Sequence, residues 1–525
     1  MKELKFEELT LKQKLGMTFT AYANGWTLTE EREEWIIEKI KEKAIGALWI
    51  VPNTGHGDKL DKFRARVKEV LDYPLLIITD AESGFGDYLV GKHNAIGAAG
   101  SEECAYAFGK LVAVSARKKG YNVVCDPVLD LSDSGSQRSL GQDKFKVAAL
   151  AKAIARGMHD GGVLTIGKHY PGGNNPLKVD SHMAESISYQ TEEELLDYSL
   201  YPYLELMKEG LLDGLMTSHK RFVNIDPDYP ASLSKKVNDI LRRQGFDGIA
   251  ITDALCMMGI LSKFGYVESK GLAIAGGNDL SLPYFKDNDE AYDAFMKCWD
   301  MGMITEERLN EAVRRVLEAQ AKTLKDPKFT EITEEDVEVF ERINRNGIYA
   351  DLDEGFAATL DRDKKYFFAL MARPETNIEG AKPGVDTFNN GWYYIDKISD
   401  RLTSLFPNSK IKIFHEFPTQ GQCYDIVDGS QGYDDVVFFT FTEPLAYTGP
   451  EQLTHRLVTL VKAMQMTDRI STLVHFGNPF VLEELPHIHR VLIGGNSENS
   501  VNAAIDVLAG KNEAKGVLTY DVKLQ

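Results

Sequence analysis

Residues 168–182, KHYPGGNNPLKVDSH, combine ionisable side chains with residues that break regular structure. Lys168 and His169 stand at the start and Asp180 and His182 at the end, and the Pro and Gly residues between them predict a loop. The spacing of Asp180 and His182 lets the carboxylate accept a hydrogen bond from one imidazole nitrogen while the other faces a pocket. Such a carboxylate fixes the tautomer and stabilises the imidazolium, so we expect His182 to transfer protons near neutral pH. Lys168 and His169 are expected to donate hydrogen bonds to a hydroxyl-rich ligand.

A second ionisable residue stands out at the end of an apolar run. Asp253 lies in GIAITDALCMMGI, where a carboxylate is costly to bury unless it has a partner or a task. One interpretation is a helix N-cap for the segment that begins near Ala254. The other is a carboxylate nucleophile, which together with a separate proton donor is what retaining glycoside hydrolysis requires.

The first 345 residues alternate between short apolar segments and amphipathic helical patterns. Seven strands are predicted, at 44–51, 74–80, 121–127, 161–170, 213–219, 247–254 and 276–282. Helices are predicted over 104–115, with Gly120 as a stop, and over 305–322, with Thr305 as the N-cap. Repeated β-α units favour a (β/α) barrel or a doubly wound sheet, and the pattern leaves the eighth strand of a barrel unidentified.

Ionisable residues follow most of the predicted strands, where a barrel places its catalytic side chains. They are Asp80, Asp126, Lys168 with His169, Ser218 with His219, Asp253 and Asp279. A ring of caps and salt bridges is the alternative interpretation. Their shared position at strand ends favours a common site at one rim.

The remaining sequence predicts a linker and a second domain. We expect a catalytic barrel over 1–345, a linker over 346–365 and an α/β/α sandwich over 366–525, whose five apolar strands begin near residue 365. The second domain is expected to complete the substrate cleft or to hold a homodimer together.

Composition narrows the class of partner. The formal net charge of −19 argues against nucleic acid and anionic membranes, which need basic patches. The five cysteines are widely spaced, no metal-ligand spacing occurs, and the sequence has no apolar signal core or membrane-length run. We therefore expect a cytoplasmic protein that binds neither nucleic acid nor a membrane surface.

Several motifs in order resemble glycoside hydrolase family 3, specifically its β-N-acetylglucosaminidase branch. KHYPG at 168–172 and DSH at 180–182 resemble the branch's Lys-His-Phe-Pro-Gly and Asp-(Ser/Thr)-His segments, and TDALCM at 252–257 resembles its nucleophile strand. The motifs CDPVLDL, RSLGQD, YPASLS, AGGNDL and GNPFVLEEL also fit, at 125–131, 138–143, 229–234, 275–280 and 477–485.

The resemblance implies a TIM-type barrel followed by a three-layer sandwich, and a role for each matching residue. Asp253 would be the nucleophile, and His182 the general acid/base with Asp180 as its partner. The sugar hydroxyls would be bound by Asp80, Arg138, Lys168 and His169, and His219 and Asp279 could reach the N-acetyl group. The implied activity is a retaining exo-acting β-N-acetylhexosaminidase that acts on a small carbohydrate substrate and needs no metal or organic cofactor.

Two departures from the family pattern surround the expected sugar. Gly173 and Asn174 stand where the family has His-Gly, with one extra residue before Asp180, and Ser83 follows Asp80 without the usual Arg. The alternatives are a phosphorylase, since a neutral histidine does not repel phosphate as a glutamate would, and a β-glucosidase or xylosidase of the same family. More distant alternatives are a Schiff-base aldolase or lyase that uses Lys168, and a sugar-binding barrel that has lost catalysis.

Overall fold

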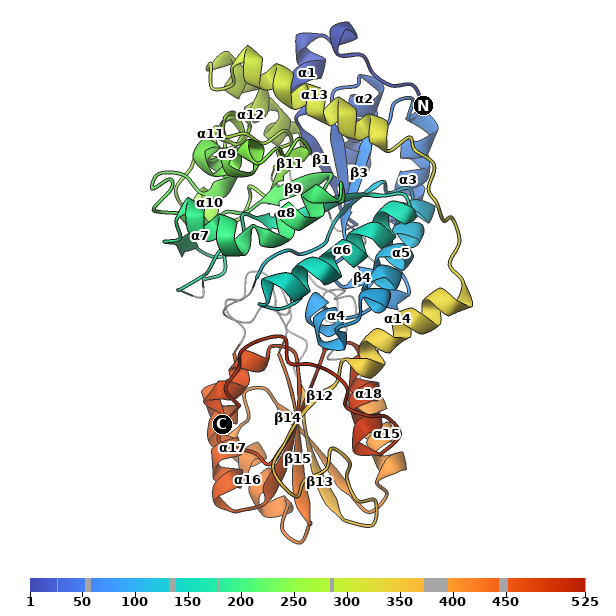
Figure 1. Ribbon diagram of the computed structural model, residues 1–525, viewed down its shortest axis with the longest axis vertical. Coiled ribbons are helices and arrows are strands. Elements are labelled where there is room, and N and C mark those ends of the chain that lie inside the picture. The colour runs from blue at the N-terminus through green and yellow to red at the C-terminus, as the bar shows by residue number, and fades with distance from the viewer. Residues whose placement is uncertain are drawn as a thin grey trace.

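The structure is a computed structural model that describes residues 1–25, 27–51, 58–131, 138–177, 179–283, 288–372, 395–442 and 452–524. Figure 1 shows two bodies along the long axis of the molecule, a helix-covered parallel sheet in blue to yellow and a second sheet in orange and red. Helix α14 (Glu334–Asn346) runs from the first body to the second. The fold is therefore the predicted α/β pair, a barrel followed by a sandwich.

A curled parallel sheet forms the centre of the first body. Its order is β1-β2-β3-β6-β7-β9-β11, and every neighbouring pair is parallel. The strands are β1 (Thr20–Ala23), β2 (Ala47–Ile50), β3 (Leu76–Asp80), β6 (Val123–Cys125), β7 (Leu164–Tyr170), β9 (Gly214–Thr217) and β11 (Ile249–Thr252). Leu280 forms a parallel bridge with Ile251, and Ser281 forms one with Phe19, so these two residues close the ring between β11 and the start of β1.

The ring differs from the predicted one at its closure. Strand β1 was missed, because TAYA contains no run of Val, Ile or Leu to signal a buried strand. The predicted strand at 276–282 contributes only the two bridging residues, 280 and 281. Asp279 consequently lies before the bridging residues Leu280 and Ser281, and not at the end of a strand as predicted.

Helices and short strand pairs surround the ring. The helices are α1 (Leu11–Met17), α2 (Glu30–Lys41), α3 (Lys59–Val70), α4 (His93–Ala99), α5 (Glu102–Lys118), α6 (Lys144–Asp160), α7 (Glu192–Glu194), α8 (Tyr201–Lys208), α9 (Lys235–Arg243), α10 (Met258–Leu261), α11 (Glu268–Ala275), α12 (Asn288–Asp300) and α13 (Glu306–Lys322). The short strands are the antiparallel pair β4 (Gly84–Phe85) and β5 (Tyr88–Leu89), and the parallel pair β8 (Ile187–Ser188) and β10 (Arg221–Phe222). Helix α13 begins as predicted, because the Thr305 side chain accepts a hydrogen bond from the amide of Arg308.

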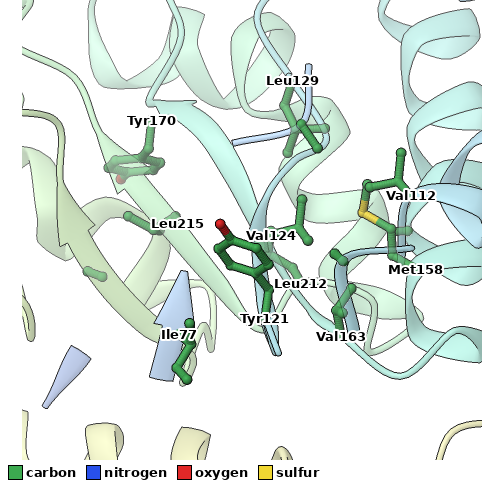
Figure 2. Close-up of a cluster of buried hydrophobic side chains, with 14 of the residues drawn as sticks. Ile77, Val112, Tyr121, Val124, Leu129, Met158, Val163, Tyr170, Leu212 and Leu215 are labelled. Carbon is green, nitrogen blue, oxygen red and sulfur yellow. The ribbon is translucent and has the colours of Figure 1, made fainter. Parts of the chain in front are cut away.

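A continuous apolar core holds the helices against the ring. Figure 2 shows part of it, where Val112 of α5 and Met158 of α6 face Val124 and other strand residues. All three side chains are completely buried. Burial of this kind, at about 25 cal/mol per Å² of apolar surface, fixes the strands and therefore the positions of the residues at their ends.

The second body is a six-stranded sheet covered by helices on both faces. Its order is β12-β17-β16-β15-β13-β14. The strands are β12 (Tyr349–Leu352), β13 (Tyr366–Ala372), β14 (Lys410–His415), β15 (Asp435–Phe441), β16 (Ile470–Phe476) and β17 (Arg490–Gly494). In Figure 1, α16 (Gln420–Gly429) and α17 (His455–Met466) cover one face, and α15 (Ile395–Leu405) and α18 (Glu498–Leu508) cover the other.

The edge strand β12 lies inside the predicted linker and pairs antiparallel with β17. Residues 349–352 are therefore part of the second sheet rather than an irregular connection. Among the described helices, none combines the length and the apolar character needed to span a bilayer.

Candidate active site

Asp253 stands directly after β11, at the rim where the parallel strands end. Its amide donates a hydrogen bond to the Thr217 carbonyl at 2.9 Å, which ties it to the end of β9. Its Oδ1 accepts from the amide of Ala254 at 2.7 Å. The backbone therefore fixes the direction of the carboxylate. An N-cap side chain accepts a hydrogen bond from an amide two or three residues further on, whereas Asp253 accepts from the adjacent amide, so this contact does not support the N-cap interpretation.

The surroundings of Asp253 favour its ionised form. Burial alone would raise the pKa of this carboxyl, but three neighbouring imidazoles and the Ala254 amide lower it to about 2. The imidazoles are those of His219, His169 and His182. The carboxylate is consequently charged at neutral pH, as a nucleophile must be.

Asp180 and His182 form the pair that their spacing predicts. The carboxylate Oδ1 lies 2.7 Å from His182 Nδ1 and also accepts from the His182 amide at 2.9 Å. Since an ionised carboxylate only accepts, Nδ1 carries the proton of this bond, and Nε2 is the nitrogen that can exchange a proton with a ligand. The pair thus has the tautomer that general acid/base chemistry needs.

The loop that carries this pair is docked onto the chain that follows Asp253. The amide of Met258 donates to the His182 carbonyl, and the amide of Gly259 donates to the Ser181 carbonyl, each at 3.1 Å. A Cβ at position 259 would lie 2.7 Å from the Ser181 oxygen, so glycine permits this close approach. Two backbone hydrogen bonds therefore fix the position of His182 relative to the segment that follows Asp253.

Asp80 and Lys168 meet at the ends of β3 and β7. The Lys168 ammonium is buried and donates to Asp80 Oδ1 at 2.5 Å and to Glu82 Oε1 at 2.7 Å. The Asp80 carboxylate itself is about half exposed, with 49% of its side chain accessible. Of these three side chains, Asp80 is therefore the one whose carboxylate oxygens are accessible to a ligand, and the buried Lys168 fixes its position through the ion pair.

The charge state of Lys168 follows from these carboxylates. Burial alone would lower its pKa, but Asp80 and Glu82 raise the pKa above the ordinary value of lysine. The ammonium therefore keeps its proton at neutral pH. A Schiff-base mechanism needs the neutral amine, so this environment counts against the aldolase alternative.

Arg138 and His169 form the neighbouring part of the rim. The guanidinium donates through Nε and Nη2 to the two oxygens of Glu82, at 2.7 and 2.5 Å, and Nη2 also lies 2.9 Å from His169 Nε2. Because a guanidinium only donates, His169 Nε2 accepts, and its protonated Nδ1 donates to Asp130 Oδ2 at 2.8 Å. These contacts fix both side chains without a ligand.

The C-terminal segment of the chain supports Arg138. The amide of Gln142 donates to the Thr519 carbonyl at 3.1 Å, and the Tyr520 hydroxyl donates to the Ser139 carbonyl at 3.0 Å. These bonds join the segment after the second sheet to the loop that carries the arginine. The second body therefore contributes to the geometry of the rim.

His219 is brought close to Asp253 but is occupied. It is almost fully buried, with its Nε2 2.8 Å from the Ala254 carbonyl and its Nδ1 2.8 Å from Ser232 Oγ. The carbonyl can only accept, so Nε2 carries the hydrogen, and burial lowers the pKa of the imidazole. His219 is thus placed to support the backbone of the residue after Asp253, which counts against the predicted contact with an N-acetyl group.

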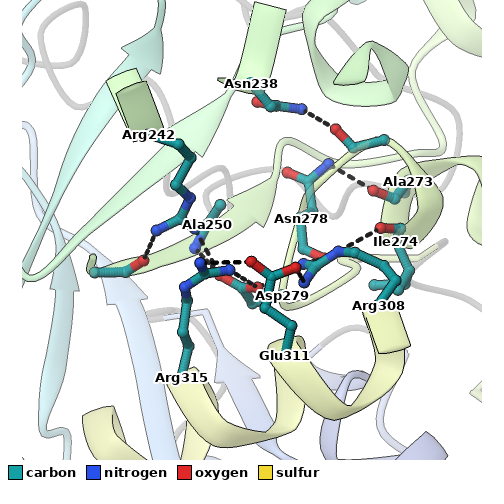
Figure 3. A network of polar contacts seen from close by, with 12 residues as sticks. Asn238, Arg242, Ala250, Ala273, Ile274, Asn278, Asp279, Arg308, Glu311 and Arg315 are labelled. Atoms are coloured by element: carbon teal, nitrogen blue, oxygen red, sulfur yellow. Dashed lines mark hydrogen bonds and ion pairs between the residues drawn. The ribbon is translucent and has the colours of Figure 1, made fainter. Parts of the chain in front are cut away.

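Asp279 is not brought into the site at all. It is completely buried, and its Oδ2 accepts from Arg242 at 2.9 Å and from the Ala250 amide at 3.0 Å. Figure 3 shows this carboxylate among three arginine side chains, next to the beginning of β11. The predicted sugar contact of Asp279 is therefore replaced by an ion-pair network at the opposite end of the strand from Asp253.

Sequence reasoning missed three groups that shape this site. Glu82 links Lys168 to Arg138, and only its position two residues after the end of β3 could have signalled it. Asp130 orients His169 and lies inside the CDPVLDL motif, so that motif held the signal. His93 of α4 lies 3.1 Å from the predicted rim residue Asp126, and no local pattern indicates this pair.

Comparison with known proteins agrees with the motifs. Residues 5–319 match the family model of the glycosyl hydrolase family 3 N-terminal domain. A β-hexosaminidase of Tolumonas auensis is 29% identical over 259 residues, which cover 47% of this chain and 77% of that protein. A β-hexosaminidase of Idiomarina loihiensis is 27% identical over 302 residues, which cover 54% of this chain and 89% of the relative.

Solved structures share the whole architecture. A glycoside hydrolase family 3 β-N-acetylglucosaminidase from Paenibacillus sp. superposes with a TM-score of 0.82 at 26% identity, over 98% of this chain and 100% of that one. A β-glucoside phosphorylase superposes with a TM-score of 0.79 at 22% identity, over 98% of this chain and 94% of that one, which is a likeness of fold.

Proposed function

Since the chain belongs to glycoside hydrolase family 3, we propose that it acts as a member of the family's β-N-acetylglucosaminidase branch and releases terminal β-linked N-acetylglucosamine with retention of configuration. The observation that carries this proposal is the docking of the His182 loop onto the segment after Asp253 through the amides of Met258 and Gly259. It joins an ionised carboxylate and an imidazole–carboxylate pair at one rim. Those are the two functions that a double displacement requires.

In the first step, the Asp253 carboxylate attacks the anomeric carbon and the glycosidic C–O bond breaks. The His182 imidazolium gives its Nε2 proton to the departing oxygen, and Asp180 stabilises the imidazolium before the transfer. The products of this step are a covalent glycosyl–Asp253 ester and the free aglycone.

In the second step, neutral His182 accepts a proton from water through Nε2 as the water oxygen attacks the anomeric carbon. The ester bond breaks and Asp253 returns to its carboxylate form, while the imidazolium is restored for the next turnover. Two inversions at the anomeric carbon give net retention.

The remaining rim residues would bind the sugar. Asp80 would accept hydrogen bonds from sugar hydroxyls, and Arg138 and His169 would line the same pocket in the orientations that Glu82 and Asp130 impose. Lys168 would act mainly through Asp80, which it holds by an ion pair. Recognition of the N-acetyl group is left to residues other than His219 and Asp279, since both are occupied elsewhere.

The decisive experiment compares nitrophenol release from the β-N-acetylglucosaminide and from the β-glucoside, with and without phosphate. Faster release from the acetylated substrate, with free N-acetylglucosamine as the product, would support the proposal. A sugar 1-phosphate would make the protein a phosphorylase, and preference for the glucoside would place it with the β-glucosidases. The first result would overturn the proposed hydrolysis, and the second would overturn the proposed sugar.

Replacing His182 by alanine is expected to lower kcat/KM by roughly 10²–10⁴-fold for a substrate with a sugar aglycone, because the leaving oxygen then departs unprotonated. A nitrophenyl substrate should lose much less in its first step, since nitrophenolate leaves without a proton. Values of kcat/KM on both substrates measure the difference, because kcat/KM reports the first step alone. Equal losses of kcat/KM on the two substrates would contradict the assignment of His182 as the acid.

Replacing Gly259 by alanine is expected to lower kcat by about 10–100-fold, because the new Cβ would lie within 3 Å of the Ser181 and Ala184 carbonyls and displace the loop. Gly421→Ala is the matched control. A Cβ there meets only Thr419 Oγ1, at 3.9 Å, so wild-type turnover is expected. Wild-type kcat in the Gly259 variant would show that the docking of this loop does not position His182.

A further inference from the structure

Two imidazoles and a carboxylate meet at the edge of the second sheet, away from the strand ends of the barrel. Asp353 Oδ2 lies 2.7 Å from His487 Nε2 and 2.6 Å from His489 Nδ1. The three ligand-type atoms all lie within 4.8 Å of one another. His487 and His489 stand two residues apart in the sequence, but nothing local links them to Asp353, which precedes His487 by 134 positions.

The sheet itself brings these residues together. Asp353 directly follows β12 and His489 directly precedes β17, and Leu352 faces Arg490 in the antiparallel register of the two strands. The Asp353 amide also donates to the His489 carbonyl at 2.9 Å. The carboxylate and one imidazole are therefore held on neighbouring strands by the backbone ladder.

The His489 ring is oriented by a stacked aromatic side chain. Phe356 lies parallel to it, with ring centroids 4.9 Å apart and an angle of 13° between the planes. This contact fixes the plane of the imidazole and presents Nδ1 to Asp353. The two imidazoles then reach the same carboxylate oxygen through different nitrogens, Nδ1 of His489 and Nε2 of His487.

We propose that Asp353, His487 and His489 bind a divalent transition-metal ion, with Zn²⁺ as the representative ion. Imidazole nitrogen with carboxylate oxygen is a ligand set for zinc and its neighbours, whereas magnesium and calcium prefer oxygen ligands alone. A tetrahedral zinc ion with bonds of about 2.0–2.1 Å separates its ligand atoms by roughly 3.3 Å. The present separations from Oδ2 need to widen by less than about 1 Å, which side chains at the surface can supply.

Exposure leaves room for the rest of the coordination shell. The side chains of His487, His489 and Asp353 are 45%, 43% and 38% exposed, so water can complete the shell. The ion would clamp the segment after β12 to the segment before β17. We therefore assign it a structural role in the second body, and turnover at the barrel rim is expected to continue without it.

The test is titration of the chelator-stripped protein with Zn²⁺ in competition with a chromophoric chelator. The wild-type protein is expected to take up one equivalent, and Co²⁺ in its place is expected to give the visible absorption of imidazole coordination. His487→Ala should weaken this binding by at least about 100-fold, more than the loss of a residue that only hydrogen-bonds to a metal ligand does. His455→Ala, which removes an exposed histidine of the same body, should leave it unchanged.

The double variant His487→Ala/His489→Ala separates this site from any other on the protein. Loss of the bound equivalent, with the urea unfolding transition of the metal-free wild type retained, supports the proposal and shows that the variant is folded. Binding that survives in the double variant, or the absence of a bound equivalent in the wild type, overturns it. Neither outcome depends on the function proposed for the barrel.

Discussion

Replacing Asp253 by asparagine is expected to lower kcat on the β-N-acetylglucosaminide by about 10⁴–10⁶-fold, the scale seen when hydrolases lose a covalent nucleophile. The amide oxygen can still accept the hydrogen bond of Ala254, which holds the wild-type carboxylate at 2.7 Å. It cannot form the glycosyl ester, so the first step has no nucleophile. Single-turnover and steady-state release of nitrophenol measure the loss.

Asp247→Asn is the control on the same stretch of chain. Asp247 precedes β11 and is 84% exposed, so its loss should leave kcat unchanged. Asp253→Gly should regain turnover with azide and give the glycosyl azide of inverted configuration, because the small anion replaces the carboxylate. More than about a tenth of wild-type kcat in Asp253→Asn, an amount that costs under 1.4 kcal/mol of barrier, would contradict the nucleophile assignment.

The pH profile provides an independent check of the same residue. Since the surrounding imidazoles lower the pKa of Asp253 to about 2, despite its burial, the carboxylate stays ionised between pH 4 and pH 8. Its protonation begins to matter only as the pH approaches about 2. If kcat/KM falls on the acid side between pH 4 and pH 8, the group responsible is therefore expected to be a rim residue other than Asp253. The fall should keep its midpoint in any variant that does not alter the ionisation of those other residues.

The residues at the rim could be predicted because strand ends are a local feature of the sequence. Asp80, Lys168 and Asp253 each close a strong apolar run, and the run marks both the strand and its end. The Asp180–His182 contact could also be predicted, since two residues with this spacing need no distant partner. Local pattern was sufficient wherever the contact itself is local.

The prediction for Asp279 failed because the strand boundary was wrong. The run GGNDLSL suggested a strand at 276–282, whereas only Leu280 and Ser281 form bridges to the neighbouring strands. A shift of a few residues moved the aspartate from the end of a strand to its beginning. Boundaries of this kind are set by pairing with β11 and with residue 19, which a single segment does not reveal.

Contacts between distant segments set the remaining limits. Glu82 meets Arg138 across 56 positions, and Asp353 meets His489 across 136. No periodicity or spacing relates the members of such pairs. The ion pair of Glu82 with Arg138 and the contact of Asp353 with His489 could therefore be identified only from the three-dimensional structure.

Replacing Asp279 by asparagine is expected to lower the free energy of unfolding by about 3–5 kcal/mol, because breaking a buried ion pair leaves its partner charges uncompensated. Arg242 and Arg308 donate to the carboxylate at 2.9 and 2.6 Å, and Arg315 lies 3.4 Å away. All three guanidinium groups are mostly buried, so water cannot replace the lost charge. Urea unfolding followed by tryptophan fluorescence measures the change.

Asp247→Asn is again the matched control, since this exposed carboxylate pairs with the same Arg315 at 3.5 Å. A surface pair of this kind contributes about 0–1 kcal/mol. The Asp279 variant should keep the wild-type KM below its unfolding transition, because the network lies at the far end of β11 from Asp253. A raised KM with unchanged stability would instead restore Asp279 as a sugar ligand, and would mean that the three arginines are balanced by other groups.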